Sequence, residues 1–341
     1  MADKNKPGES KARESKARES KAWENRPGGV VVLAGPTASG KSALALDLAE
    51  ALNGTIINAD SMQVYRDLPV LTAQPDASDQ ARVPHRLYGF LDIDDACDAQ
   101  RWAELAGKEI DGILDAGRLP IVVGGTGLYI RALISGFSPM PEISGNTRET
   151  ARRLVLELGP QEMHRRLAER DPVTAERLKV GDRQRIARAW EVLEETGQPL
   201  SWWQAQPAVP LTSHRFLPLV ITPDRTDLYA GVDGRFAAMV ERGAVAEVER
   251  AEAIARQGGG GGRKALGYPE LAAVVHGQTT LDQAIPAAQQ ATRRYAKRQL
   301  TWFRHQVPLA NFISPDLPAM KFSQSSTAQT RQKIRDFLLT P

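Results

Sequence analysis

The chain has 341 residues with a formal net charge of +3, and 42% of its residues are hydrophobic. This length allows a large core with an additional domain, and the single cysteine, Cys97, excludes an internal disulfide framework and a cysteine-rich zinc module. No apolar run approaches the length of a membrane span and no signal-peptide pattern opens the chain, so we expect a cytoplasmic protein without a membrane partner.

The positive charge is concentrated at the beginning of the chain. Residues 1–28 carry eight Lys or Arg and five Asp or Glu, while the rest of the chain holds 36 residues of each sign. Within this segment, residues 10–22 repeat the sequence SKARE and contain almost no apolar side chains. A segment of this composition cannot compensate its ordering entropy, and we predict that residues 1–28 form a disordered tail.

The first apolar run is followed by a glycine-rich motif. Residues 30–34 form a continuous apolar run that is rich in β-branched residues, as in a buried parallel strand, and residues 43–52 are strong helix formers. The residues between them match the pattern G-x-x-x-x-G-K-[ST] of a P-loop. This phosphate loop consists of Gly35, Pro36, Thr37, Ala38, Ser39, Gly40, Lys41 and Ser42.

A strand, a glycine-rich loop and a helix in this order favour phosphate binding. The glycines let several backbone N–H groups point into one hollow, to which the helix adds the positive end of its dipole. Lys41 supplies a cation for the terminal phosphates, and Ser42 offers an oxygen to Mg²⁺. The motif predicts a bound di- or triphosphate without indicating whether that ligand is ATP.

Strands and helices alternate through the segments that follow. We predict strands at 55–59, 119–123 and 216–221, and helices at 100–117 and 128–134, with a loop-rich stretch over 69–95. This alternation predicts a parallel, doubly wound α/β sheet of the P-loop type, whose ligands bind beyond the carboxyl ends of the strands. The phosphate loop, Asp60 and residues 124–126 are therefore expected on one rim.

Asp60 directly follows its strand on that rim. Its carboxylate could hold Mg²⁺ or accept a proton from a nucleophile. It could equally cap a turn that begins at Ser61 and Met62. Position alone leaves these alternatives open.

Helical patterns dominate two later parts of the chain. Helices are predicted at 148–158, 161–169, 173–178 and 183–196, and from 225 to 304 with an interruption at the glycine run 258–262. The predicted organisation is a core of 29–142 and 213–312, an inserted all-helical domain of 143–212, and a weakly ordered C-terminal segment of 313–341.

Several classes of P-loop protein do not fit the sequence. The Asn-Lys-x-Asp run of a GTPase is missing, and the strand at 119–123 ends in Gly-Gly-Thr instead of the aspartate expected of a motor. Two basic clusters point to RNA: residues 148–190 hold eleven Lys or Arg against seven Asp or Glu, and residues 283–315 have five Lys or Arg, interleaved aromatics and no acid. A solvated helix face is the alternative for either cluster.

Taken together, the motifs resemble those of one family, the tRNA dimethylallyltransferases, over roughly 30–304. The matching segments are GPTASGKS, ADSMQVYRDLPVLTAQP, PHRLYGFLD, GRLPIVVGGTGLYIRAL, DRQRIARAWEVLEETG and TRRYAKRQLTWFR. The resemblance implies transfer of a dimethylallyl group from dimethylallyl diphosphate to N6 of the adenosine immediately 3′ of the anticodon.

The resemblance also implies roles for single residues. The phosphate loop would cradle the diphosphate, with Mg²⁺ near Ser42, and Arg235 and Lys41 would stabilise its charge. Asp60 would be the general base, and Thr126 would help to seat the adenine amine. This chain has Gly231 where the family has a second arginine, which makes Arg235 more important, and it lacks the eukaryotic zinc finger.

The remaining implied contacts are with the tRNA anticodon stem-loop. The resemblance assigns most of them, and the second basic cluster adds the last two. They are Asp60, Ser61, Met62, Gln63, Thr126, Arg148, Gln184, Arg185, Ile186, Ala187, Arg188, Lys264, Gly267, Tyr268, Arg294 and Arg298.

Three alternatives compete with this hypothesis. A P-loop kinase of a small metabolite would use Asp60 as base for a hydroxyl, but leaves the basic helices without a role. A prenyltransferase of free adenine nucleotides would not need the helical insertion, and a non-catalytic RNA-binding protein would not need Lys41 and Ser42. We expect an enzyme that acts as a monomer.

Overall fold

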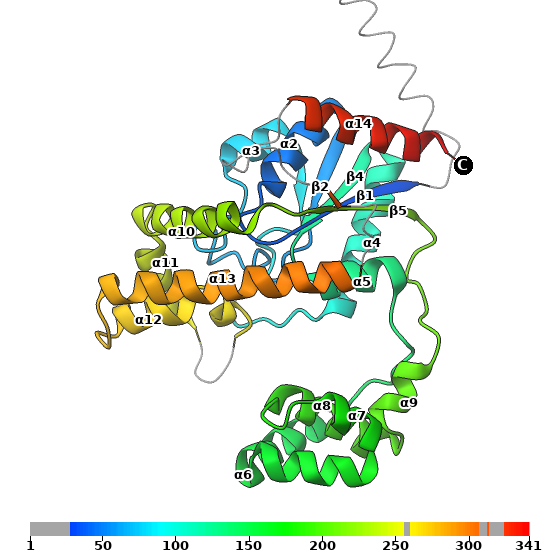
Figure 1. Ribbon diagram of the computed structural model, residues 1–341, viewed down its shortest axis with the longest axis vertical. Helices are drawn as coiled ribbons and strands as arrows, with labels where there is room; N and C mark the ends of the chain where they lie inside the picture. The colour runs from blue at the N-terminus through cyan, green and yellow to red at the C-terminus, as the bar shows by residue number, and fades with distance from the viewer. Residues whose placement is uncertain (1–27, 256–259, 307–311, 314–323, 341) are drawn as a thin grey trace, which may run out of the picture. The chain divides into compact units, whose positions relative to one another are not determined.

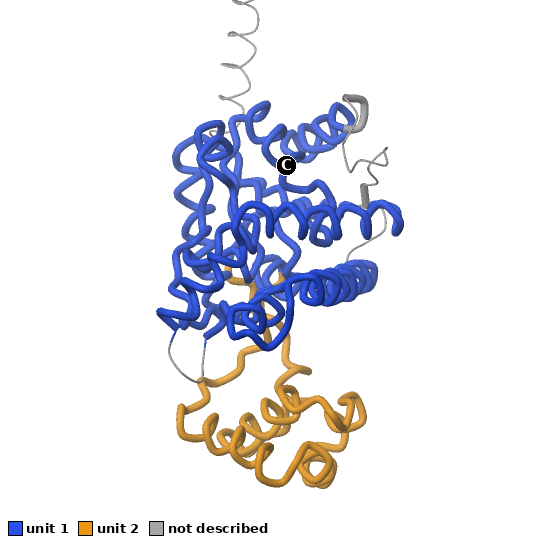
Figure 2. The backbone as a smooth tube through the Cα atoms, turned by 90° about the vertical axis from the view of Figure 1, so that its left-hand side faces the viewer, with its two compact units in different colours: residues 1–134, 212–341 blue, residues 135–211 orange. Residues whose placement is uncertain are grey.

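The computed structural model describes residues 28–255, 260–306, 312–313 and 324–340 and divides into two compact units, 1–134 with 212–341 and 135–211 (Figure 2). The second unit begins eight residues before the predicted insertion of 143–212 and ends one residue before its end. The predicted tail lies outside the described residues, apart from Gly28, as do Gly258 and Gly259 of the glycine run.

The first unit contains a sheet of six parallel strands in the order β3-β2-β4-β1-β5-β6 (Figure 1). Strand β1, the apolar run before the phosphate loop, lies between β4 and β5, and all six of its residues are buried. This confirms the predicted parallel α/β fold. The strands are β1 Gly29–Ala34, β2 Gly54–Asn58, β3 His85–Arg86, β4 Leu119–Gly124, β5 Arg215–Ile221 and β6 Phe312–Ile313.

The helices of this unit bury apolar side chains against the sheet and against one another. Leu44 and Leu48 of α2 are fully buried in one core cluster with the strands, and Phe236 and Tyr268 belong to a second cluster formed by the later helices. These helices are α2 Lys41–Ala51, α3 Ala77–Arg82, α4 Ala99–Asp115, α5 Gly127–Ser135, α10 Arg225–Glu241, α11 Ala244–Ile254, α12 Tyr268–Val275, α13 Leu281–Gln306 and α14 Gln324–Leu339.

Two regions differ from the sequence-based expectation. The stretch predicted as loop-rich contains the short helix α3, which Asp76 caps by accepting from the N–H groups of Ser78 and Asp79, and the two-residue strand β3. The weakly patterned C-terminal segment contains α14, whose Ile334 is fully buried in the core cluster around β1 and α2. Strand β3 and helix α14 depend on partners far away in the sequence.

The second unit is all-helical, as predicted. It comprises α6 Gly145–Arg170, α7 Pro172–Arg177, α8 Arg183–Thr196 and α9 Leu200–Ala205. Helix α6 is interrupted at Gly159, which has a φ of 79° and precedes Pro160, so the two predicted helices on either side of 159–160 are confirmed. Proline removes an N–H donor and opposes a helical conformation at the residue before it.

No helix in the part of the chain that the structure describes combines the length and the apolar character needed to cross a bilayer.

Gly124 is packed too closely for any side chain. An added Cβ would lie 2.2 Å from both the carbonyl carbon and oxygen of Ala59. We therefore expect Gly124→Ala to lower the free energy of unfolding by about 1–3 kcal/mol or more, because two backbones would have to separate. Gly112→Ala, on the exposed face of α4 with nothing within 4 Å of its added Cβ, is the control and should stabilise by about 0.4–1 kcal/mol. Equal urea midpoints for the two variants would contradict this packing argument.

Candidate active site

The phosphate loop adopts the tight backbone path that its sequence predicts. Gly40 has a φ of 82° and Ala38 a φ of 59°, so the chain turns through left-handed conformations immediately before α2. A Cβ at Gly35 would lie 3.0 Å from the Ile221 carbonyl oxygen, so this glycine permits close approach of β5. The loop therefore presents the N-terminal end of α2 at the carboxyl edge of the sheet.

Lys41 is buried within this loop. Its side chain is 7% exposed, and its Nζ donates to the Pro36 carbonyl oxygen at 3.1 Å. Burial lowers the pKa of Lys41 to about 8; the negative charge of Asp60 opposes this shift and the positive charge of Arg235 adds to it. Burial disfavours the charged form of this amine, and Asp60 offsets that effect only in part. A bound anion would therefore stabilise the protonated Lys41 strongly.

Arg235 reaches the same loop from α10. Its Nη1 donates to the Thr37 hydroxyl at 3.3 Å. Burial lowers the pKa of Arg235, and the carboxylate of Asp60 acts in the opposite direction. Two cations from distant parts of the chain thus face one phosphate loop.

Asp60 follows the end of β2 and makes the turn contact that was one of the three roles considered for it. Its Oδ1 accepts from the Met62 N–H at 2.9 Å, while its own N–H donates to Asn58 Oδ1 at 2.8 Å. The negative charge of the same carboxylate opposes the lowering of the Lys41 and Arg235 pKa values, so it is also close to the phosphate loop. The turn holds the carboxylate in place and does not remove it from the rim.

Thr126 connects the ends of β4 and β2. Its N–H donates to the Ala59 carbonyl oxygen at 3.2 Å, and its hydroxyl accepts from the Ser61 N–H at 2.9 Å and donates to Ser61 Oγ at 3.2 Å. These contacts bring the ends of β2 and β4 together, and the pairing of Ala34 with Gly124 places the end of β1 beside them, as predicted. Gln63, also predicted here, donates to the carbonyl oxygens of Thr72 and Ala73, so its amide holds the following loop.

Three tyrosines lie near Asp60; the sequence pattern drew attention only to Tyr295, among the aromatics of the second basic cluster, and predicted no role at this site for any of them. Burial and the charge of Asp60 raise the pKa values of Tyr88, Tyr129 and Tyr295, with burial the largest cause in each case. Tyr88 also lines a cavity of about 260 Å³ together with Ser42 and Gln63. Aromatic residues in alternating or helical patterns look like core residues in a sequence, which is why they were missed.

Gln299 is a further residue that the sequence did not reveal. It lies on α13 with 6% exposure, accepts from the Thr37 N–H at 2.9 Å and donates to the Gly125 carbonyl oxygen at 2.8 Å. A single amide thus joins the phosphate loop to the turn after β4. It lies within the segment TRRYAKRQLTWFR that resembles the family, but nothing in that pattern assigned a role to it.

The outer surface of α13 is basic. Arg294, Lys297 and Arg298 are exposed, and together with Trp302 and His305 they line a depression of about 660 Å³. The Arg298 guanidinium lies 5.6 Å from the Tyr295 ring centroid. Cations and an indole on one face are suited to phosphates and unstacked bases.

The segment before α12 combines an exposed lysine with two structural residues. Lys264 is exposed, whereas Tyr268 is 2% exposed and donates its hydroxyl to Glu252 Oε1 at 2.6 Å. Gly267 has a φ of 87°, and a Cβ there would lie 2.4 Å from a Phe236 ring carbon. Lys264 is therefore the member of this predicted contact set whose side chain is accessible.

The predicted contact residues of the second unit fall into two groups. Arg148, Gln184 and Arg185 are exposed, but Ile186 and Ala187 are buried with 0% and 6% exposure. The latter two pack in a hydrophobic cluster, so any influence of theirs on RNA would be indirect.

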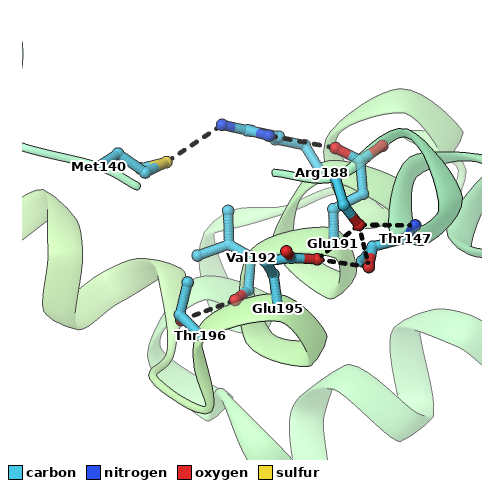
Figure 3. Close-up of polar contacts among 8 residues, drawn as sticks. Met140, Thr147, Arg188, Glu191, Val192, Glu195 and Thr196 are labelled. Carbon is cyan, nitrogen blue, oxygen red and sulfur yellow. Dashed lines mark hydrogen bonds and ion pairs between the residues drawn. The ribbon is translucent and has the colours of Figure 1, made fainter. Parts of the chain in front are cut away.

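Arg188 is held by neighbours in the same unit (Figure 3). Its Nη1 donates to Glu191 Oε2 and its Nη2 to Met140 Sδ, both at 3.2 Å. In the same view, Glu195 accepts from Thr147 in the first turn of α6, next to Arg148. This polar network fixes α6 against α8 and leaves Arg188 partly neutralised.

These features define a P-loop protein in which a buried lysine and an arginine face a carboxylate at the rim of a parallel sheet. A family profile described as IPP transferase matches residues 63–306, and one described as isopentenyl transferase matches residues 28–90. The chain belongs to the tRNA dimethylallyltransferase (IPP transferase) family.

Similar proteins cover most of the chain. It is 52% identical over 287 residues to a tRNA dimethylallyltransferase of Rhodospirillum centenum, covering 84% of this chain and 91% of the relative. It is 49% identical over 310 residues to one of Paramagnetospirillum magneticum, covering 91% and 97%.

Solved structures that resemble this chain carry names of the same family. A tRNA isopentenylpyrophosphate transferase from Bacillus halodurans superposes with a TM-score of 0.66 at 31% identity, covering 92% of this chain and 97% of that chain. A eukaryotic dimethylallyltransferase acting on tRNA has a TM-score of 0.71 at 26% identity, covering 91% and 79%.

Proposed function

We propose that this chain transfers the dimethylallyl group of dimethylallyl diphosphate to N6 of the adenosine immediately 3′ of the anticodon in tRNA. The allylic C–O bond breaks, a C–N bond forms, and diphosphate and one proton are released. The observation that carries the proposal is the convergence of Lys41 and Arg235 with Asp60 and Thr126 on one rim of the sheet, in a chain of this family.

The departing diphosphate needs positive charge that is already in place. Lys41, Arg235 and the N-terminal end of α2 provide it from a largely buried position. Charges and dipoles that are fixed before reaction stabilise the transition state without reorganisation, usually the largest catalytic contribution.

The nucleophile needs a base, because the lone pair of adenine N6 is delocalised into the ring. Asp60 accepts the amine proton as the C–N bond forms, and Thr126, hydrogen-bonded to Ser61, orients the amine. General-base catalysis of this kind contributes about 10²–10⁴ in rate. The adenine must leave its stack to reach the rim, at a cost of a few kcal/mol.

The oxygen donors at the loop are suitable for Mg²⁺. The Ser42 side chain is exposed at the start of α2, and among the residues with described positions no group of three or more His, Cys, Asp or Glu could hold a metal by itself. Mg²⁺ commonly binds through few protein oxygens together with substrate phosphates and waters, so Ser42 would hold it jointly with the diphosphate. When bound, Mg²⁺ would neutralise part of the charge on the leaving diphosphate.

We assign the tRNA contacts to exposed cations, with Arg294 and Arg298 on α13 and Arg148 and Arg185 in the second unit. The cytoplasmic location and the monomeric state stay predictions from the sequence.

Arg294→Gln is expected to weaken tRNA binding and to lower the slope of log affinity against log salt by about one, because one phosphate contact is lost. Filter binding across a salt series measures both quantities. Lys108→Gln, which removes an exposed cation of α4, is the control and should leave the slope unchanged. Equal slopes for both variants and the wild type would indicate that the basic face of α13 is exposed to solvent and does not bind tRNA.

Labelled dimethylallyl diphosphate, unmodified tRNA and Mg²⁺ test the reaction itself. We expect label on the adenosine 3′ of the anticodon, and no transfer to AMP. A parallel incubation with labelled ATP tests for a kinase. Failure to label tRNA, or transfer of phosphate from ATP to a metabolite, would overturn the proposal.

A further inference from the structure

We infer that Gln299 is a positioning residue for diphosphate binding: its amide holds the phosphate loop and the turn at 124–126 at a fixed separation. The inference rests on the proposed function. Gln299 belongs to α13, more than 170 residues after either partner, and joins them at 2.9 Å and 2.8 Å.

The chemistry of the contact requires an amide. Gln299 Oε1 accepts from the Thr37 N–H while Nε2 donates to the Gly125 carbonyl oxygen. A carboxylate cannot donate, and an ammonium group or guanidinium cannot accept, so no charged side chain satisfies both partners, whereas the amide does so with two separate atoms. Asparagine is one methylene shorter and cannot span the same two groups without movement of the backbone.

The partner residue is shaped for this amide. A Cβ on Gly125 would lie 2.2 Å from Gln299 Nε2 and 3.0 Å from the Gly35 carbonyl oxygen. The glycine therefore leaves the space that the amide fills. Gln299 is 6% exposed, so the loss of its hydrogen bonds would leave two backbone groups without the partners they have now.

The contact extends to a cation of the site. Thr37, whose N–H donates to Gln299, accepts with its hydroxyl from Arg235 Nη1 at 3.3 Å. The order Gln299–Thr37–Arg235 thus fixes one side of the phosphate loop. The other partner of the amide, Gly125, directly precedes Thr126, whose hydroxyl accepts from the Ser61 N–H.

Gln299→Met tests the inference because methionine keeps the length of the side chain but makes neither hydrogen bond. We expect KM for dimethylallyl diphosphate to rise roughly tenfold, as does Kd for pyrophosphate measured by calorimetry, with a smaller change in kcat and in KM for tRNA. Gly125→Ala should reproduce this pattern from the other partner. Gln299→Glu keeps the acceptor for Thr37 and loses the donor to Gly125, so it should also raise KM.

Gln289→Met is the matched control. Gln289 lies on the same helix and donates to the Asp233 carbonyl oxygen at 3.0 Å, away from the phosphate loop. It should leave KM for dimethylallyl diphosphate at the wild-type value, and thermal melting identifies any variant that is not folded. A double-mutant cycle with Arg235→Lys should show non-additive effects on pyrophosphate affinity, since both residues act through Thr37.

The outcomes separate the two proposals. Wild-type protein that prenylates tRNA, with folded Gln299→Met and Gly125→Ala variants that keep wild-type KM and pyrophosphate affinity, would overturn the role of Gln299 alone. A wild-type protein that does not prenylate tRNA would overturn the proposed function. Equal losses in all kinetic constants would reduce Gln299 to a general structural residue and also overturn the inference.

Discussion

Replacing Asp60 with asparagine is expected to lower kcat for tRNA prenylation by about 10²–10⁴-fold, because the variant can no longer accept the amine proton. The Asp60 carboxylate is held by the Met62 N–H and lies close to Lys41 and Arg235. An asparagine oxygen can still accept from the Met62 N–H, so the turn should persist. Single-turnover measurements with preformed complexes report the chemical step directly.

In the Asp60→Asn variant, the affinity for tRNA should change little although kcat falls. A group that acts mainly in the transition state changes kcat much more than ground-state binding. Asp67→Asn is the control, since Asp67 also accepts a backbone N–H, that of Ile93, at 2.9 Å and belongs to the same segment. If Asp60→Asn weakened tRNA binding as strongly as it slowed turnover, Asp60 would be a binding residue and not a base.

Lys41→Met is expected to reduce kcat/KM for dimethylallyl diphosphate by at least about a hundredfold, because a transition-state charge contact in a buried site is lost. The same residue predicts a pH dependence. The pKa of Lys41 in the ligand-free protein is about 8. Protonated Lys41 binds the anion, so kcat/KM should fall as the pH rises through about 8.

Lys41→Arg keeps the positive charge at this position but raises the pKa of the group that carries it, so it tests whether the pH dependence comes from Lys41. Arginine stays protonated throughout this range, so its kcat/KM, although lower than in the wild type, should lose the decline near pH 8. A pyrophosphate affinity that stays constant from roughly one pH unit below the Lys41 pKa of about 8 to roughly two units above it would contradict the role given to Lys41. Mutation of the exposed Lys108 provides the background profile.

Local sequence patterns were sufficient for the central strands and the phosphate loop. The run before Gly35 is continuous and apolar, and the structure buries all of it in β1. The rule that ligands bind beyond the carboxyl ends of parallel strands correctly brought Asp60 and Thr126 together, and their connection through Ser61 confirms it. The predicted interruption between two helices at Gly159 is also present.

Contacts between distant segments could not be predicted. Nothing near Gln299 indicates that its amide meets Thr37, 262 positions away. Strand β3 has only two residues and exists because β2 provides its hydrogen-bonding partners. Ile186 and Ala187 lie in a segment that resembles an RNA contact, but they are buried; for Ile186 the local apolar stripe of α8 already indicated this.

Helix α14 has a consequence for biosynthesis. Its Leu338 and Phe337 lie where a Cβ on Gly29 would be, at 2.6 Å and 3.0 Å, and Arg215 donates to the Phe337 carbonyl oxygen at 2.9 Å. Strand β1 is thus covered by a helix that is translated long after it. Until α14 is synthesised, the apolar face that it covers stays exposed on the nascent sheet, and exposed apolar surface of this kind favours aggregation during synthesis.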